Sequence, residues 1–381
     1  MGTIASPTPD AMLALASALH LTRTLDASPA RILRTLAVGL FCAAGLVLHA
    51  APSHAADGPA PAKANAAAQP GGRIVNIAQV EAAIARGAIV WDVRSADDYK
   101  RGHLPGAINF GDAGKVLRDE QREDFLPTAA IAKAFGDAGL DPRQEVVVYG
   151  GRGNAYAYFG GYAVRYFGGR NVSVFHDGFE GWQEAGKPVS TEPHQRPKIA
   201  LTLAPNPAIA ATTDEVVKRF NALSVQVLDV RTRKEFSGDD IRAIRGGHIP
   251  GAISIPVEQN WQDPEAPQKL AKKEAANTAG LALKDRSALE ALYKDLDRNK
   301  ETIVYCQSGV RASETAAVLE TLGFKDVKVY DSSWLGWAAK LSAPVENETF
   351  LNVGALTGQL NAQINALKRR VDELEKQLAK K

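Results

Sequence analysis

Cysteine is so scarce in this chain that its position directs the search for chemistry. The 381 residues include two cysteines, Cys42 and Cys306. Residues 303–305 have the β-branched and aromatic character of a buried strand, and residues 313–322 have the composition of a helix that ends at Gly323. The residues between them are therefore predicted to form a strand-to-helix loop with the sequence Cys306-Gln307-Ser308-Gly309-Val310-Arg311.

Such a loop suits a cysteine that reacts with an anion. The carboxyl edge of a parallel sheet is where open α/β folds bind ligands, and backbone N–H groups at the start of a helix can converge on a negative charge. The same field favours the thiolate of Cys306, and Arg311 adds a fixed positive charge. The expected chemistry is attack on the sulfane sulfur of an anionic donor, which leaves a persulfide on Cys306 that a second nucleophile then removes. This chemistry requires no metal or organic cofactor. The alternative is that Cys306 is a small buried hydrophobic residue.

The elements around this loop belong to a sequence that occurs twice. Both copies start with a β-branched run ending in Asp-Val-Arg, at Asp92 and Asp229, and both continue through Gly-His-(Leu/Ile)-Pro-Gly-Ala. A second strand, a glycine-containing loop, a helical segment and a third strand follow in each copy. Short apolar runs that alternate with helical patterns indicate parallel strands with helices on both faces. The predicted architecture is two α/β domains in tandem.

These repeated motifs resemble the tandem rhodaneses, a family of two-domain sulfurtransferases. The resemblance covers residues 74–345 and implies a first rhodanese-like domain at 74–190, a linker at 191–210 and a second domain at 211–345. It also implies that the first domain is silent and that the second carries the nucleophile. The sequence agrees, because Gly150 stands in the first copy where Cys306 stands in the second.

The residue pairs that recur in both copies are predicted to be structural. Asp229 and Arg231 repeat Asp92 and Arg94, and a silent domain that keeps the same pair indicates a shared internal bridge. By the same reasoning His248, like its counterpart His103, is expected to shape a turn near the site.

The residues that contact the donor are expected in the loop and in an insertion of the second copy. Gln307, Ser308, Gly309, Val310 and Arg311 are the candidates in the loop. The resemblance further implies a substrate-reaching arginine in the insertion, so that Arg242 or Arg245 would bind the donor; the alternative for both is a solvated surface charge. Glu235 departs from the family, whose thiosulfate enzymes can carry a basic residue there.

Several functions remain open at this point. Thiosulfate is the favoured donor, with cyanide or a thiol as the acceptor, and 3-mercaptopyruvate is the alternative because the loop falls between the two types. A non-catalytic persulfide carrier or binding module is an alternative of another class. Phosphatases and arsenate reductases that share the fold need an arginine six residues after the cysteine, whereas Arg311 is the fifth residue after Cys306 and Ala312 the sixth.

The beginning of the chain has the layout of a secretory signal peptide. Arg31 and Arg34 precede an uncharged run over residues 35–51, and Ser53-His54-Ala55 gives a small-x-small cleavage pattern. We expect a signal peptide at 1–55, a flexible spacer at 56–73 and a periplasmic or secreted protein; an uncleaved anchor is the alternative. The formal net charge of +2 implies no pull on nucleic acid or membrane.

The end of the chain, residues 351–381, is predicted to be an amphipathic helix of the coiled-coil type. Its apolar residues alternate steps of three and four from Val353 to Leu378, with Ile364 and Val371 at a-type positions and leucines at d-type positions. This pattern favours a parallel two-stranded coiled coil, hence a homodimer through residues 353–378. The alternative is a single helix packed on the body of the protein.

Overall fold

The computed structural model describes residues 73–119, 124–350, 364–365, 367–371 and 374–375. All of them belong to one compact unit, residues 63–381. The predicted signal peptide and nearly all of the spacer lie outside the described residues. None of the described helices is long and apolar enough to cross a membrane.

The first copy of the repeat forms a parallel sheet with strand order β1-β4-β3-β2. Every residue of β2 and β3 is buried, as in strands covered by helices on both faces. The strands are β1 (Ile74–Val75), β2 (Ile89–Asp92), β3 (Val146–Tyr149) and β4 (Val172–Phe175). The helices are α3 (Ile77–Ala85), α4 (Ala96–Arg101), α5 (Ala113–Val116), α6 (Thr128–Ala138), α7 (Ala155–Tyr166) and α8 (Gly178–Glu184).

The second copy forms a parallel sheet with strand order β5-β10-β9-β6-β8. Its strands are β5 (Ala210–Ala211), β6 (Val225–Asp229), β8 (Ile253–Ser254), β9 (Glu301–Tyr305) and β10 (Asp326–Tyr330). The helices are α9 (Thr213–Arg219), α10 (Arg233–Ser237), α11 (Ala266–Ala271), α12 (Arg286–Leu292), α13 (Val310–Thr321) and α14 (Ser333–Ala339). Three short 3₁₀ turns are η2 (Pro207–Ile209), η3 (Val257–Asn260) and η4 (Ala279–Leu281). The order β5-β10-β9-β6 repeats β1-β4-β3-β2, so the predicted tandem α/β fold is confirmed.

A small antiparallel pair extends the second domain beyond its predicted end. Strand β7 (Arg245–His248) lies in the insertion of the second copy, and it pairs with β11 (Glu346–Phe350). The predicted second domain ends at residue 345, and the next five residues form this strand.

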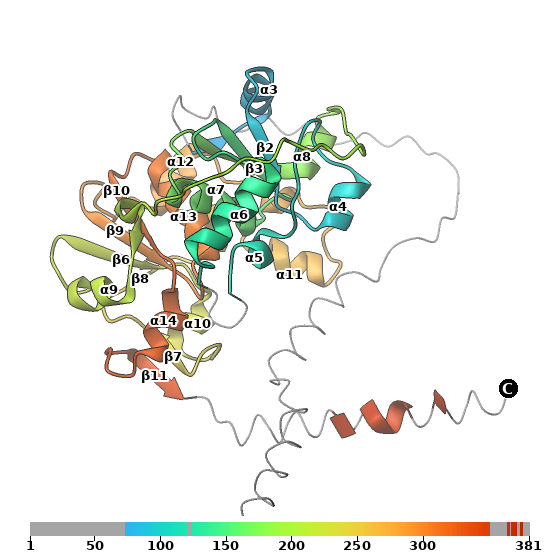
Figure 1. The fold of residues 1–381 in the computed structure, drawn as a ribbon. Helices are drawn as coiled ribbons and strands as arrows, with labels where there is room; N and C mark the ends of the chain where they lie inside the picture. Colours follow the sequence, from blue (N-terminus) through green and yellow to red (C-terminus); the bar gives the residue numbers. More distant parts are fainter. Residues whose placement is uncertain (1–72, 120–123, 351–363, 366, 372–373, 376–381) are drawn as a thin grey trace, which may run out of the picture. The chain divides into compact units, whose positions relative to one another are not determined.

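The two copies pack through α7 of the first and α13 of the second, which lie side by side (Figure 1). One hydrophobic cluster contains buried residues of both, such as Phe159 and Val318. At the end of this interface the Glu320 carboxylate accepts hydrogen bonds from Arg165 and Arg73, each at 2.8 Å. The first copy thus supports the helix that follows the Cys306 loop.

The described residues of the tail are helical, and their apolar side chains are exposed. Ile364, Leu367, Val371 and Leu374 keep between 41% and 61% of their surface exposed. The pairing of this helix with a second copy stays a prediction.

Candidate active site

Cys306 lies where the sequence places it, in the loop that joins β9 to α13 at the carboxyl edge of the sheet. Gly309 caps the helix in the left-handed conformation with a φ of +81°. A Cβ atom at Gly309 would come within 2.5 Å of Asp331 Oδ1, so both the backbone conformation and the space require glycine here.

Ser333 holds this loop from behind. Its Oγ accepts hydrogen bonds from the N–H groups of Cys306 at 3.1 Å and Gly309 at 2.9 Å, and it donates to the Tyr330 carbonyl at 2.6 Å. Ser333 is fully buried and has a φ of +48°, which non-glycine residues rarely adopt. Sequence reasoning did not single out Ser333. The available signal was its alignment with Gly178, which has a φ of +57° in the first copy.

The rest of the loop backbone is free to bind an anion. Of the residues that the structure describes, none accepts a hydrogen bond from the N–H groups of Gln307, Ser308, Val310 or Arg311. Free N–H groups at the positive end of a helix are a suitable environment for negative charge. The loop can therefore stabilise an anionic sulfur species at Cys306.

The thiol itself lies deep in the loop. Cys306 is 1% exposed and is the one cysteine among the described residues. Its carbonyl accepts a hydrogen bond from the Trp334 N–H at 3.0 Å, and the Gln307 carbonyl accepts one from the Leu335 N–H at 3.1 Å. These bonds fix the loop against the start of α14, so a donor meets the loop residues before it meets the sulfur.

The positive charge of Arg311 is compensated by Glu235. Both Glu235 carboxylate oxygens accept hydrogen bonds from Arg311, each at 2.8 Å, and Glu235 Oε1 also accepts one from Arg242 at 3.1 Å. Burial alone would raise the pKa of Glu235, but the hydrogen bonds and charge of Arg311, with further help from Arg242, lower the pKa to about 2. Glu235 is therefore ionised at neutral pH. This buried glutamate, which stands where the family's thiosulfate enzymes can have a basic residue, forms an ion pair with Arg311.

The structure separates the two arginines of the insertion. The Arg242 side chain is half exposed beside the loop, and its carbonyl accepts a hydrogen bond from Gln307 Nε2 at 2.8 Å. Arg245 is 3% exposed, and its guanidinium donates to the Glu348 carboxylate and to backbone carbonyls of residues 337, 338, 340 and 343. The predicted donor contact is not supported for Arg245, because its donors are used inside the domain. Arg242 remains the candidate.

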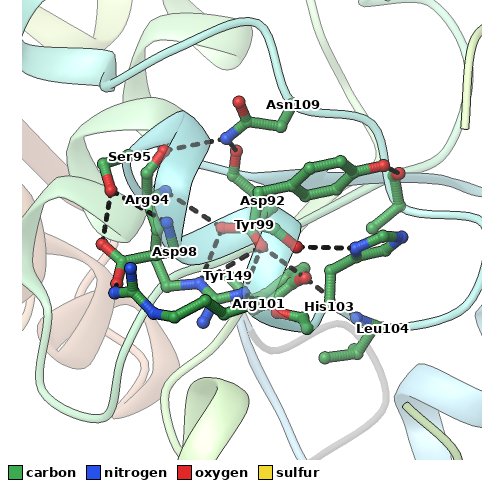
Figure 2. Close-up of polar contacts among 12 residues, drawn as sticks. Asp92, Arg94, Ser95, Asp98, Tyr99, Arg101, His103, Leu104, Asn109 and Tyr149 are labelled. Carbon is green, nitrogen blue, oxygen red and sulfur yellow. Dashed lines mark hydrogen bonds and ion pairs between the residues drawn. The ribbon is translucent and has the colours of Figure 1, made fainter. Parts of the chain in front are cut away.

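The Asp–Arg pairs that recur in both copies form the same internal bridge. Arg231 Nη2 donates to Asp229 Oδ2 at 2.6 Å and to the Gly247 carbonyl at 2.7 Å. Figure 2 shows the counterpart in the first copy, where Arg94 Nη2 donates to Asp92 Oδ2 at 2.6 Å and to the carbonyl of residue 102 at 2.7 Å. The first copy has Gly150 in place of Cys306 and still holds the same bridge, so the bridge serves the fold.

The two motif histidines also have matching surroundings. His248 stacks on Phe236 with 3.6 Å between ring centroids, and His103 stacks on Tyr99 with 3.7 Å. In each pair the histidine Nδ1 lies 2.9 Å from the backbone carbonyl of its stacking partner (Figure 2 for His103). This geometry supports the structural interpretation of His248.

The loop of the first copy is closed by a carboxylate of its own domain. The Arg152 N–H donates to Glu180 Oε2 at 2.7 Å, and the Arg152 guanidinium pairs with Glu184 and contacts Thr278 of the second domain. In the second copy Leu335 occupies the position of Glu180, so the corresponding N–H group, that of Ser308, stays open. The first copy therefore lacks both the nucleophile and an open loop.

A second opening lies away from this chemistry. A groove of about 470 Å³ is lined by residues of both copies, including Arg73, Arg165 and Glu320. Glu320 belongs to the last turn of α13, whereas Cys306 precedes the first turn, so the groove lies at the opposite end of the helix. Among the described residues no His, Cys, Asp and Glu side chains form a group that could hold a metal ion.

The chain is similar to known proteins in sequence and in fold. The chain is 34% identical over 260 residues to a "Putative thiosulfate sulfurtransferase" of Mycobacterium tuberculosis, which covers 65% of this chain and 87% of the relative. It is 32% identical over 266 residues to the "Thiosulfate sulfurtransferase" of Corynebacterium glutamicum, with 65% and 81% covered. The solved anaerobic ergothioneine biosynthesis enzyme from Chlorobium limicola shares the fold, with a TM-score of 0.61, 22% identity and coverage of 72% of this chain and 70% of that one.

The chain also matches a family model. The sequence model of the Rhodanese-like domain family matches residues 76–185 and 212–340, which are the two copies described above. These segments make up more than half of the chain, and the second contains the Cys306 loop. The chain therefore belongs to the rhodanese-like domain family.

Proposed function

We propose that this rhodanese-family sulfurtransferase transfers sulfane sulfur from thiosulfate to a thiophilic acceptor, such as cyanide or a thiol, through a persulfide on Cys306. The observation that carries the proposal is the open loop around Cys306: free backbone N–H groups, the start of α13 and a neutral hydroxyl at Ser333 surround the only thiol of the described residues. The names of the relatives in Mycobacterium and Corynebacterium agree with thiosulfate as the donor.

The proposed reaction has two steps that balance without a further reactant. The Cys306 thiolate attacks the outer sulfur of thiosulfate; a sulfur–sulfur bond forms at Cys306, the bond within thiosulfate breaks, and its electron pair leaves with sulfite. Cyanide then attacks the terminal sulfur of the persulfide, thiocyanate forms, and the electron pair of the broken bond restores the thiolate. The loop N–H groups stabilise the anionic terminal sulfur between the two steps.

The charges around the loop keep 3-mercaptopyruvate as a second candidate donor. Glu235 compensates Arg311, which leaves Arg242 as the half-exposed cation beside the loop. One available positive charge suits a monoanion at least as well as the dianion thiosulfate. The same ion pair argues against phosphate transfer, because Arg311 faces Glu235 rather than an oxyanion in the loop.

The test is thiocyanate formation by residues 56–381 with thiosulfate and cyanide, beside a Cys306→Ser variant that keeps the shape of the side chain. We expect many turnovers from the unmodified protein and none from the variant. Equal thiocyanate production by the two proteins would refute the proposal, and a single turnover would favour the persulfide carrier. Parallel assays with 3-mercaptopyruvate and with a phosphate ester define the donor class.

We also propose that the protein is exported, on the evidence of Arg31, Arg34 and the apolar run that follows them. The residues concerned lie outside the described part of the structure. Cleavage after Ala55 would give a mature chain that begins at Ala56, which N-terminal sequencing of the protein from its native cell would detect. A chain that retains the leader would contradict this proposal.

A further inference from the structure

Strand β11 is an addition to the rhodanese-like domain. The family match ends at residue 340, and β11 spans Glu346–Phe350. It pairs antiparallel with β7, with Thr349 opposite Gly246 and Phe350 opposite Arg245. In the described part of the chain β7 has no other strand partner, so β11 alone satisfies this edge.

Side chains of β11 strengthen the pairing. Thr349 Oγ1 donates to the Gly238 carbonyl at 2.8 Å, and the Glu348 carboxylate accepts from Arg245 at 2.7 Å. The approach is close, because a Cβ atom at Gly246 would come within 2.4 Å of Thr349 Oγ1. Strand β11 therefore holds residues 238–248 at both ends of that segment.

The other side of this segment contacts the Cys306 loop. Gln307 Nε2 donates to the Arg242 carbonyl at 2.8 Å, and Trp334 Nε1 donates to the Arg245 carbonyl at 2.9 Å. Trp334 also donates its backbone N–H to the Cys306 carbonyl. Residues 238–248 thus lie between β11 and the reactive loop, with Arg242 at the contact.

We infer that β11 is a positioning element of the active site: it holds residues 238–248 so that the Arg242 guanidinium stays beside the Cys306 loop and guides an anion to the thiol. The inference deepens the proposed function by assigning anion guidance to Arg242 and its placement to β11. Without β11, the β7 groups that face it lose their partners, and residues 238–248 are held from the side of the Cys306 loop, by Gln307, Trp334 and Arg231. The segment that carries Arg242 is then less firmly fixed.

Two truncations separate β11 from the tail that follows it. A chain that ends at Phe350 keeps β11, and a chain that ends at Val345 lacks it. The readout is the ratio of the rates at which iodoacetate and iodoacetamide alkylate Cys306, since the two reagents perform the same reaction and differ in charge. We expect this ratio to be about five-fold lower in the chain ending at Val345 than in the full protein, and we expect the same of Arg242→Gln. The reason is that one positive charge near the thiol contributes about 1 kcal/mol in a solvated site. The chain ending at Phe350 should keep the ratio of the full protein.

Point variants keep the inference testable if the shorter chain does not fold. Thr349→Val removes the hydrogen bond to Gly238 with little change in shape, and we expect it to lower the alkylation ratio about two-fold. Thr349→Ser should restore the ratio. The matched control is Thr321→Val, which removes a similar bond from a hydroxyl to the Ala317 carbonyl in α13. An unchanged ratio in Thr349→Val, or an equal change in Thr321→Val, would overturn the inference.

The outcome is independent of whether sulfur is transferred. If the full chain makes no thiocyanate but removal of β11 lowers the alkylation ratio, the proposed function is refuted and the positioning role is supported. If the chain ending at Val345 makes thiocyanate and keeps the alkylation ratio of the full protein, the proposed function is supported and the positioning role is refuted. If both proposals hold, removal of β11 lowers kcat/KM for thiosulfate, because this constant reports the half-reaction in which the donor anion reaches the thiol.

Discussion

The two copies of the domain hold the same loop with different groups. In the second copy the neutral hydroxyl of Ser333 accepts two N–H groups and leaves the others open. In the first copy Gly178 has no side chain to offer, and the Glu180 carboxylate accepts the Arg152 N–H instead. The left-handed backbone of Ser333 costs about 1 kcal/mol. That strain is retained where the loop is open and is absent where the loop is closed.

Glu235 sets the charge that a donor meets at the loop. It is buried, ionised and bound to both Arg311 and Arg242, so a donor anion competes with this carboxylate for the arginines. With a pKa of about 2 the competition persists over the whole range of assay pH. Because the folded pKa lies below the usual value for a glutamate, the bridge stabilises the fold at neutral pH, and this contribution is lost only as the pH falls from about 4 towards 2.

We therefore expect Glu235→Gln to lower the KM for thiosulfate about three- to ten-fold, since the variant removes one competing negative charge beside Arg311 and Arg242. The same change should lower the free energy of unfolding by about 2 kcal/mol, because the partly buried Arg311 loses its ionic partner. Steady-state kinetics and urea unfolding measure the two effects.

Glu145→Gln is the control for the Glu235 variant, since it removes one negative charge from an exposed pair with Arg86 in the first domain. It should leave the KM for thiosulfate unchanged. A KM that is unchanged or raised in Glu235→Gln would show that this carboxylate does not compete with the donor.

At the scale of elements, α13 packs at the interface between the two copies and contains a buried glutamate, Glu314. Glu314 is fully buried; Oε1 accepts a hydrogen bond from Trp261 Nε1 at 2.7 Å, and Oε2 has no partner among the described residues. Burial raises the pKa of Glu314 to about 8, although the Trp261 bond opposes the shift. The unfolded chain ionises near pH 4.5, so this residue makes the fold progressively less stable as the pH rises from about 5 to 8.

Glu314→Gln should remove this loss of stability. We expect little difference from the unmodified protein at pH 5 and a gain of about 3 kcal/mol in the free energy of unfolding at pH 8, because the amide mimics the protonated acid. Thermal unfolding over this pH range gives the measurement. Glu290→Gln on α12, which removes a surface partner of Arg286, should keep the pH dependence of the unmodified protein. If the stability of Glu314→Gln and that of the unmodified protein changed with pH in the same way, the expectation would be contradicted.

Local sequence signals predicted the strand and the helix that flank the reactive loop. They did not predict the features that depend on contacts between residues far apart in the sequence. β9, the loop and α13 follow from a continuous apolar run, a glycine and a helical segment, which are local signals. β11 has the sequence Glu-Asn-Glu-Thr-Phe and is mostly exposed, so no hydrophobic pattern marks it, and its pairing depends on β7 about 100 residues earlier. The role of Arg245 was missed for the same reason, since its acceptors lie in residues 337–348.

At the scale of the whole molecule, the first domain supports the turn behind the Cys306 loop. Asp124 of the first copy accepts a hydrogen bond from Ser332 at 2.9 Å, and Arg118 lies 3.6 Å from Asp331. Asp331 and Ser332 directly precede Ser333, which holds the loop. The first domain, which has Gly150 in place of the cysteine, thus fixes the residue on which the geometry of the second domain depends.

The tail is the part of the chain that would join two such molecules. Ile364, Leu367, Val371 and Leu374 lie on helical residues and are exposed, which is unfavourable for a lone chain in water. A β-branched residue at a and leucine at d favour a parallel pair of helices. The pattern spans about four heptads, so association is expected to be weak enough to depend on concentration.

The mass in solution tests the dimer. We expect static light scattering of residues 56–381 to give twice the mass of the monomer at about 100 μM, and a chain that ends at Phe350 to give the monomer mass with β11 intact. Leu367→Glu places a charge at a d position and should also give the monomer. Arg369→Gln makes the same change of one charge at an f position, which faces away from the partner helix, and should leave the dimer unchanged. A full chain that stays monomeric, or equal masses for Leu367→Glu and Arg369→Gln, would refute the coiled-coil dimer.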